Sequence, residues 1–258
     1  MGFYMKNLLK KFCNIDEVET VAVGGSSAVK TADDKSDIDV YVFSRSGVTL
    51  KEREKIIKPV SSNYEIGGEY FGSGDEFWAD EIGRQFDIMY WDMSWFESVV
   101  ENTWVKHYPS NGYTTCFLYT LKNFDIIYDK NGWLSGLQSK IDTPYPKELR
   151  ENIIRRNLML MKDKPFASYY EQIDKALHRG DYVSVNHRLA AFVASYFDVI
   201  FAANEQLHPG EKRLVRYVKE NCKKIPKDFE QNLLQALTVS DNLLQTLNKI
   251  TTEVKKIV

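Results

Sequence analysis

Residues 21–43 read VAVGGSSAVKTADDKSDIDVYVF, and this stretch decides the fold. It opens with a short apolar β run that ends abruptly at Gly24 and Gly25. After a polar linker, residues 38–43 alternate with the period of two that is typical of a strand. The stretch therefore predicts two strands that are joined by a glycine turn and a polar linker.

The glycine turn has the residue types that bind phosphate. Gly24 and Gly25 lack Cβ atoms, so the backbone can turn sharply and approach a ligand closely. Ser26 and Ser27 follow at an expected helix N-terminus, where backbone N–H groups and a hydroxyl can bind phosphate oxygens. These four residues are the predicted binding site for the phosphates of a nucleotide.

Two carboxylates open the second strand of the stretch. Asp37 and Asp39 are two residues apart, so their side chains project to the same face. Two adjacent carboxylates repel each other unless a cation lies between them, and hard oxygen ligands favour Mg²⁺. An isolated Asp-x-Asp is common at solvated strand ends, but its place directly after a glycine turn favours a metal site.

A two-metal phosphoryl-transfer site needs a further carboxylate near the nucleophile. Asp87 interrupts the apolar strand-like run of residues 86–90, where a buried lone carboxylate costs several kcal/mol unless something pairs with it. We expect Asp87 to be the third metal ligand, although it could instead point outward from a half-exposed strand. Asp92 is the second candidate, but a residue at a strand end more often caps a turn.

The hydrophobic periodicity of the sequence changes near residue 144. Strand patterns at residues 38–43, 86–90 and 124–128 alternate with short helices before this point, and only helical periodicity follows it. The sequence therefore predicts an α+β protein, with a small mixed β-sheet domain over residues 1–144 and an all-α helical bundle over residues 145–258. The expected helices of the bundle span residues 147–162, 166–179, 183–204, 210–221, 228–237 and 241–258. The last of them has an apolar stripe that suits either the bundle core or a homodimer seam.

The composition excludes several classes of protein. The 258 residues are 43% hydrophobic, which excludes wholesale disorder, and no apolar run is long enough to span a membrane. The three cysteines are far apart without a CxxC pair, which excludes a disulfide scaffold or zinc ribbon and fits a reducing cytoplasm. The formal charge of −2 does not indicate bulk nucleic-acid binding. We expect a cytoplasmic protein with no membrane partner.

The charge is distributed unevenly along the chain. Residues 1–144 hold 15 basic and 22 acidic side chains, and residues 145–258 hold 19 basic and 14 acidic. Two explanations are open. The difference could be chance variation in surface charge, or it could reflect an acidic metal-binding half that faces a basic, phosphate-binding half. In the second case the active site is a cleft between the halves, where Lys212 and Arg213 reach the triphosphate and Phe77 and Trp78 lie nearby. The alternative for Lys212 and Arg213 is that they are ordinary solvated side chains. The acidic segment 69–81 either attracts a cationic acceptor or is an exposed loop.

Gly25-Ser26, ten further residues, Asp37-x-Asp39 and the later carboxylate of Asp87 resemble the nucleotidyltransferase superfamily that includes DNA polymerase β. The longer form GGSSAVKTADDKSDIDVYVF, with a helical C-terminal half, is similar to bacterial aminoglycoside and lincosamide adenylyltransferases and to their uncharacterised relatives. The specific likeness covers residues 21–43 and Asp87, and over the helical half it is only architectural. The resemblance implies that Gly25 and Ser26 contact the triphosphate and that the three aspartates bind the metals.

The function expected from these features is nucleotidyl transfer. A nucleoside monophosphate would move from an NTP, by the resemblance ATP, to a hydroxyl of a small molecule such as an antibiotic, with two Mg²⁺ ions as cofactors and pyrophosphate as the second product. Two alternatives remain open: the same chemistry on a protein or tRNA partner, and a nucleotide-binding module without catalysis. The intact set of Asp37, Asp39 and Asp87 favours an enzyme over the last of these.

Overall fold

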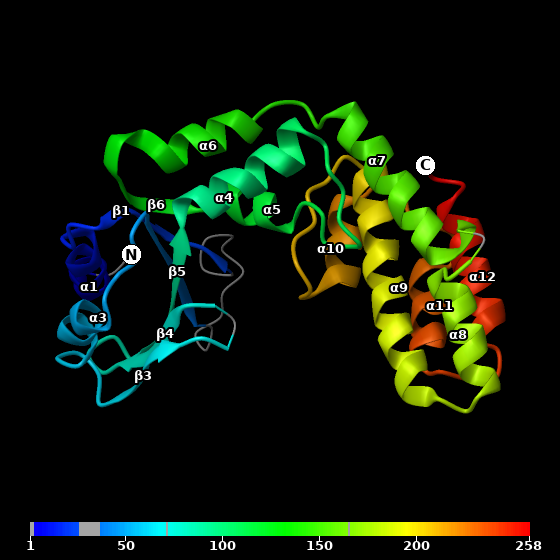
Figure 1. The fold of residues 1–258 in the computed structure, drawn as a ribbon, viewed down its shortest axis with the longest axis horizontal. Coiled ribbons are helices and arrows are strands. Elements are labelled where there is room, and N and C mark those ends of the chain that lie inside the picture. The colour runs from blue at the N-terminus through cyan, green and yellow to red at the C-terminus, as the bar shows by residue number, and fades with distance from the viewer. Residues whose placement is uncertain (1–2, 26–36, 71, 165) are drawn as a thin grey trace. The chain divides into compact units, whose positions relative to one another are not determined.

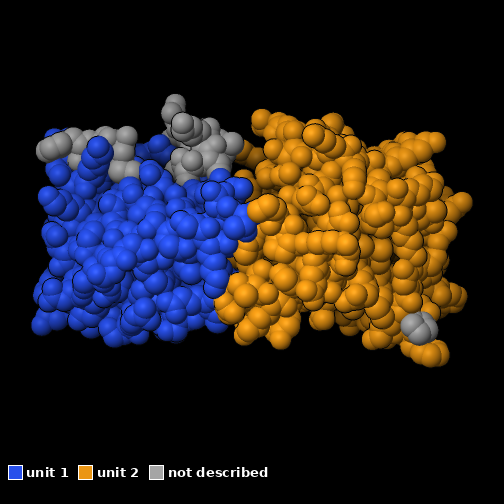
Figure 2. Space-filling view, turned by 90° about the horizontal axis from the view of Figure 1, so that it is seen from above, with its two compact units in different colours: residues 1–100, 120–143 blue, residues 101–119, 144–258 orange. Residues whose placement is uncertain are grey.

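The computed structural model describes residues 3–25, 37–70, 72–164 and 166–258. The chain forms two compact units (Figures 1 and 2): unit 1 comprises residues 1–100 and 120–143, and unit 2 comprises residues 101–119 and 144–258. The boundary predicted after residue 144 stays a prediction, because a compact unit is not by itself an independently folding domain. Among the described residues, no helix is both long and apolar enough to cross a membrane.

Unit 1 is built on a six-stranded sheet with the order β3-β4-β5-β2-β1-β6. The pair β2–β5 is parallel and the other neighbouring pairs are antiparallel, so the sheet is mixed and the predicted α+β class is confirmed. The strands are β1 (Val18–Val23), β2 (Ile38–Ser44), β3 (Asn63–Gly68), β4 (Gly74–Ala79), β5 (Arg84–Asp92) and β6 (Asp125–Asp129). The helices of this unit are α1 (Phe3–Cys13), α3 (Leu50–Ile57), α4 (Met93–Val100) and α6 (Trp133–Ile141), and α5 (Cys116–Lys122) begins in unit 2 and ends in unit 1.

Strand β2 is buried on both faces of the sheet, because its side chains pack alternately into one core and the other. Val40 and Val42 pack into the core that α1 and α3 form on one face of the sheet. Phe43 points to the other face, where its ring lies 5.3 Å from that of Phe96 in α4 and 5.1 Å from that of Trp133 in α6. Because successive side chains of a strand face opposite ways, one short apolar run serves two helical layers.

The acidic segment before β5 is a strand hairpin rather than a loop. Strands β3 and β4 were not predicted, because β4 carries Asp75 among its apolar residues. Asp75 is buried and accepts hydrogen bonds from the Tyr90 hydroxyl at 2.6 Å and the Gly67 N–H at 2.8 Å, and Arg53 lies 3.6 Å from its carboxylate. Phe77 is buried against Phe86, so its predicted place in a substrate cleft is wrong.

Unit 2 is a bundle of helices, as predicted. They are α7 (Lys147–Leu158), α8 (Tyr169–His178), α9 (Tyr182–Ala203), α10 (Leu214–Asn221), α11 (Phe229–Leu237) and α12 (Leu243–Val254), with π-helical turns η1 (Glu101–Val105) and η3 (Met159–Asp163). The apolar stripe of the last helix is buried in the intramolecular core through Leu243, Leu247, Ile250 and Val254. The stripe is therefore bundle core, and the predicted homodimer stays untested.

A buried carboxylate ties residues 101–119 to the rest of unit 2. Asp198 of α9 accepts hydrogen bonds from the Thr114 N–H at 3.1 Å, the Thr114 hydroxyl at 2.6 Å and the Asn157 amide at 3.0 Å. Burial raises the pKa of Asp198 to about 7, and these three donors only partly oppose the shift. The folded chain therefore holds a proton on this carboxyl at a pH where the unfolded chain does not.

Replacement of Asp198 by Asn is expected to remove a pH dependence of stability. Well below pH 4 the Asp198 carboxyl is protonated in the folded and the unfolded state, so its contribution to the free energy of unfolding is fully present. As the pH rises toward 7, the carboxyl ionises in the unfolded state but stays largely protonated in the folded state, and this contribution is lost. The wild-type protein should therefore lose up to about 1.4 kcal/mol of unfolding free energy per pH unit in this window, relative to Asp198→Asn. Urea unfolding of both proteins by circular dichroism at several pH values tests this, and parallel curves would contradict it.

Candidate active site

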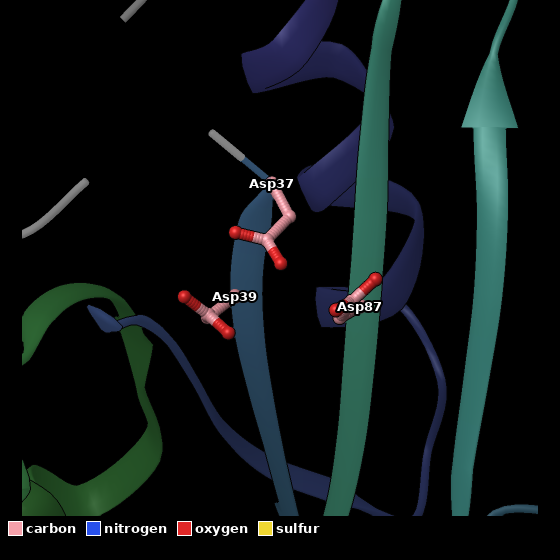
Figure 3. A group of neighbouring side chains, drawn as sticks. All are labelled: Asp37, Asp39 and Asp87. Atoms are coloured by element: carbon pink, nitrogen blue, oxygen red, sulfur yellow. The ribbon is translucent and has the colours of Figure 1, made fainter. Parts of the chain in front are cut away.

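The parallel pairing of β2 and β5 brings the predicted carboxylates together. Asp39 and Asp87 are direct register partners, and Asp37 lies two residues before Asp39. Figure 3 shows the three side chains projecting from these two neighbouring strands. Each offers one carboxylate oxygen, and the three oxygens lie within 4.8 Å of one another.

The three aspartates lie on the sheet face that is covered by aromatic side chains further along the strands. Tyr41 follows Asp39 by two residues, and Trp91 follows Asp87 by four, so each pair shares this face. The rings of Tyr41 and Trp91 are 4.7 Å apart in the buried aromatic layer. The carboxylates are only half-buried, which leaves them open to a ligand.

Electrostatics make this arrangement costly without a cation. Two carboxylates at the 4.8 Å limit repel by about 3 kcal/mol at an effective dielectric constant of about 20, and solvent screening reduces this value. Burial raises the pKa of Asp87, a hydrogen bond from Gln85 opposes that shift, and the charges of Asp37 and Glu76 add to it. The donor set of three carboxylates is the set of hard oxygen ligands that Mg²⁺ binds, so the residues present fit this metal.

The glycine turn packs directly against this cluster. The Gly24 N–H donates a hydrogen bond of 2.9 Å to the Asp39 carbonyl, and a Cβ atom at Gly24 would lie 2.6 Å from the Tyr41 ring. Gly25 has a left-handed φ of 59°, and a Cβ atom there would lie 1.7 Å from the carboxylate oxygen of Asp39. Both positions therefore require glycine, and the backbone of Gly25 borders the carboxylate cluster.

The remaining predicted residues have mixed outcomes. Ser26 and Ser27 lie outside the described residues. Lys212 and Arg213 are exposed in unit 2, and their predicted contact with the triphosphate across a cleft between the two halves stays a prediction. Trp78 on β4 is 45% exposed, and its predicted place beside the same cleft also stays a prediction.

Asp92 has a structural role. It accepts a hydrogen bond of 2.7 Å from the Trp95 N–H and so caps the start of α4. Asp92 is an odd number of residues from Asp87 on the same strand, so the alternation of β5 directs the two side chains to opposite faces. It is therefore not an alternative third ligand.

Two polar residues beside the cluster were missed at the sequence level. The Gln85 amide donates a hydrogen bond of 2.9 Å to Asp87, and the spacing of two residues on one strand was a usable signal for it. Glu76 is the register partner of Asp87 on β4, and it was missed because β4 was not predicted as a strand. Both lie beside Asp87 on the same face of the sheet.

Two family models match the chain. Residues 5–66 match the family described as nucleotidyltransferase domain. The matched residues include the glycine turn, Asp37 and Asp39. Residues 113–214 match a domain of unknown function, DUF4037, which spans the buried Asp198 cluster of unit 2. No curated protein matches the chain.

Solved structures with a similar arrangement include three proteins from bacteria. A nucleotidyltransferase-like protein from Exiguobacterium sibiricum 255-15 is 9% identical, with a TM-score of 0.48 and coverage of 98% of this chain and 74% of its own. Spectinomycin adenyltransferase AAD(9) from Enterococcus faecialis, solved with ATP and spectinomycin, is 14% identical, with a TM-score of 0.33 and coverage of 98% and 100%. The STING-associated CdnE c-di-GMP synthase from Capnocytophaga granulosa is 17% identical, with a TM-score of 0.28 and coverage of 98% and 77%.

These three likenesses are too low to bear on substrate. The assignment of the chain depends instead on the family model, whose match includes two of the three clustered aspartates. Residues 5–66 thus match the nucleotidyltransferase domain family, and this match supports nucleotidyl transfer as the general chemistry of the chain.

Proposed function

We propose that this protein transfers a nucleoside monophosphate from an NTP, with ATP as the expected donor, to a hydroxyl of a small-molecule acceptor and releases pyrophosphate. The observation that carries the proposal is the cluster of Asp37, Asp39 and Asp87, whose ligand oxygens lie within 4.8 Å of one another beside a glycine turn. Such a cluster supplies the metal ligands that phosphoryl transfer requires.

Asp37 and Asp39 would hold Mg²⁺, with Asp87 completing the ligand set for a second ion. When bound, Mg²⁺ neutralises the negative charge of the phosphates and of the leaving pyrophosphate. The strand pairing of β2 with β5 holds the three carboxylates in place before the ligand arrives. This prior placement is the main catalytic contribution of the chain, since such reactions depend on positioning and electrostatics.

The turn at Gly24 and Gly25 would position the triphosphate. The Gly25 backbone lies so close to the Asp39 carboxylate that no side chain fits between them. A phosphate bound to the metal beside Asp39 would therefore meet backbone rather than side-chain atoms at this point. Ser26 and Ser27 are the proposed hydroxyl and N–H donors that follow it.

Asp87 would accept the proton of the attacking hydroxyl. Its burial and the nearby charges of Asp37 and Glu76 raise its pKa, which favours the protonated form relative to an exposed carboxylate. Gln85 donates a hydrogen bond to one Asp87 oxygen and would help to hold this carboxyl in position for the acceptor. The proton would leave this carboxyl after the pyrophosphate departs.

A small hydroxylated acceptor fits the composition better than a nucleic acid. The chain has a formal charge of −2, and a protein that binds nucleic acid in bulk is usually basic. By its resemblance to resistance enzymes, aminoglycosides and lincosamides are the first acceptors to test, and the cytoplasm is the expected location.

The test mixes the purified protein with Mg²⁺, each NTP in turn and a panel of hydroxylated acceptors, and measures pyrophosphate. Release that depends on an acceptor, with the acceptor gaining the mass of one nucleoside monophosphate, is the expected result. An NTP labelled at the α-phosphate in the presence of protein and tRNA separates the alternatives. A label that enters only protein or tRNA would replace the small-molecule proposal, and binding of Mg·NTP without any pyrophosphate would indicate a non-catalytic module.

Gly25→Ala is expected to lower transfer at least about a hundredfold. The added methyl group would overlap the Asp39 carboxylate, so this metal ligand must move, and loss of one such interaction costs about two powers of ten or more. Gly83→Ala is the matched control, because Gly83 has a φ of 66° and no atom lies within 4 Å of the place that its added methyl group would occupy. Both variants should lose about 1–2 kcal/mol of stability from the left-handed backbone, but only Gly25→Ala should lose activity. Equal activities would show that the turn does not position the site.

A further inference from the structure

Unit 2 contains a cavity of about 630 Å³ that is lined by residues of α9, α10 and α11. This volume falls within the range of sites that bind small molecules. Its walls are mainly apolar, from Val193, Phe197, Leu214, Val215, Leu233 and Leu237. The cavity therefore suits a ligand with an apolar body.

The side chains that line the cavity include three cations and two anions, so one positive charge has no matching negative charge among them. Arg216 pairs with Glu220 at 2.7 Å, and Lys219 pairs with Glu230 at 2.9 Å, so these four charges neutralise one another. Arg213 also lines the cavity, and it forms no ion pair with any of the described residues. The lining thus presents one uncompensated positive charge.

The backbone at Arg213 adds to this positive potential. Arg213 has a left-handed φ of 58° and directly precedes α10, and its side chain provides no cap for the helix. The positive end of the helix dipole lies there, and Leu214 and Val215 of the first turn line the cavity. A guanidinium and a helix N-terminus beside the same apolar cavity both favour a negatively charged group.

We propose that this cavity binds a small molecule that has an apolar body and one anionic group, a carboxylate, sulfonate or phosphate. The anion contacts Arg213 and the first turn of α10, and the apolar body lies against Phe197 and Leu237. A cationic ligand is disfavoured because it would approach an uncompensated arginine, and a neutral ligand would leave that charge unused. None of the observations behind this proposal depends on nucleotidyl transfer, so it stands or fails without the proposed function.

Two fluorescent probes that differ only in charge test the ligand class. The first is 8-anilinonaphthalene-1-sulfonate, and the second is N-phenyl-1-naphthylamine, which has the same rings without the sulfonate. The sulfonate probe should bind the folded full-length protein about tenfold more tightly, and the difference should shrink at high salt. Equal affinities, or no binding of either probe, would overturn the proposal.

Arg213→Gly removes the charge while keeping a residue that favours the left-handed backbone, so the variant should remain folded. It should bind the sulfonate probe about tenfold more weakly and the neutral probe unchanged. Arg188→Ala removes an exposed arginine of α9 that is not among the lining residues, and it should leave both affinities as they are. If both variants lower the affinity for the sulfonate probe equally, the net charge of the protein and not this site holds the anion, and the proposal is overturned.

The position of the ligand is tested on α11. Leu237 lines the cavity and is 53% exposed, whereas Leu234 is 58% exposed and does not line it. Leu237→Glu should abolish binding of both probes, because it places a carboxylate in the apolar wall, and Leu234→Glu should not change it. Both changes are at exposed positions, so thermal melting should show folded proteins. Equal effects of the two substitutions would place the probes elsewhere and overturn the proposal.

Discussion

Asp39→Asn is expected to lower the rate of nucleotidyl transfer by at least about a thousandfold while the protein stays folded. The carboxylate is half-buried at the start of β2, where its proposed partner is a metal ion that is worth several kcal/mol to the transition state. Asp37→Asn should have an effect of similar size for the same reason. Pyrophosphate release under saturating NTP measures both.

The same substitutions should make the metal-free protein no less stable. Removal of one negative charge relieves repulsion among oxygens that lie within 4.8 Å of one another. Thermal melting should therefore show an unchanged or higher melting temperature without Mg²⁺, and a smaller gain on its addition than in the wild type. Calorimetry with Mg²⁺ and a non-hydrolysable NTP should show binding at least about tenfold weaker.

Asp125→Asn is the matched control for these two variants. Asp125 is an exposed strand carboxylate on β6, outside the cluster, so its removal changes the net charge by the same amount. It should keep wild-type turnover and wild-type Mg·NTP affinity. Near-wild-type turnover of Asp39→Asn or Asp37→Asn would show that these residues are not metal ligands.

The centre of the site could be predicted from the sequence because its parts are close together in the chain. Asp37 and Asp39 lie in one strand pattern, and the period of two was enough to place both on one face. Asp87 was identified as a lone carboxylate in an apolar run. Its alignment with Asp39 depends on the parallel pairing of β2 with β5, which joins residues almost fifty positions apart and leaves no local signal.

The hairpin of β3 and β4 could not be predicted, because one of its buried residues is charged. Asp75 is stabilised inside unit 1 by Arg53 and the Tyr90 hydroxyl, which come from α3 and β5. A pattern that scores apolar alternation cannot detect such a partner at a distance. For the same reason Glu76 was assigned to an acidic segment, although it lies beside Asp87 on the sheet.

The need for glycine at residue 25 was predicted, but its exact cause was not. The sequence suggested close approach to a phosphate, whereas the structure shows close approach to the Asp39 carboxylate. The helical unit was predicted well, since helices depend on local periodicity and on breaks at proline and glycine. Its cavity beside Arg213 depends on how α9, α10 and α11 pack, which no pattern in the sequence describes.

Asp87→Asn is expected to separate binding from chemistry. A residue that accepts the proton of the acceptor hydroxyl contributes about 10² to 10⁴ to the rate, so kcat should fall by this factor. Asp37 and Asp39 remain in place to hold the metal of the nucleotide, so the Kd for Mg·NTP should stay within about threefold of wild type. Single-turnover kinetics and calorimetry on the same protein samples give the two values.

Asp92→Asn provides the comparison for this variant, because Asp92 lies on the same strand and caps α4 through the Trp95 N–H. Asparagine is an equally good capping residue, so both stability and turnover should stay near wild type. An equal loss of NTP binding and of turnover in Asp87→Asn would show that Asp87 supports the nucleotide site rather than the proton transfer. Unchanged turnover in Asp87→Asn would remove it from the catalytic site. The hydroxyl proton would then have to leave through another group beside the cluster, and Glu76, the register partner of Asp87 on β4, is the next candidate.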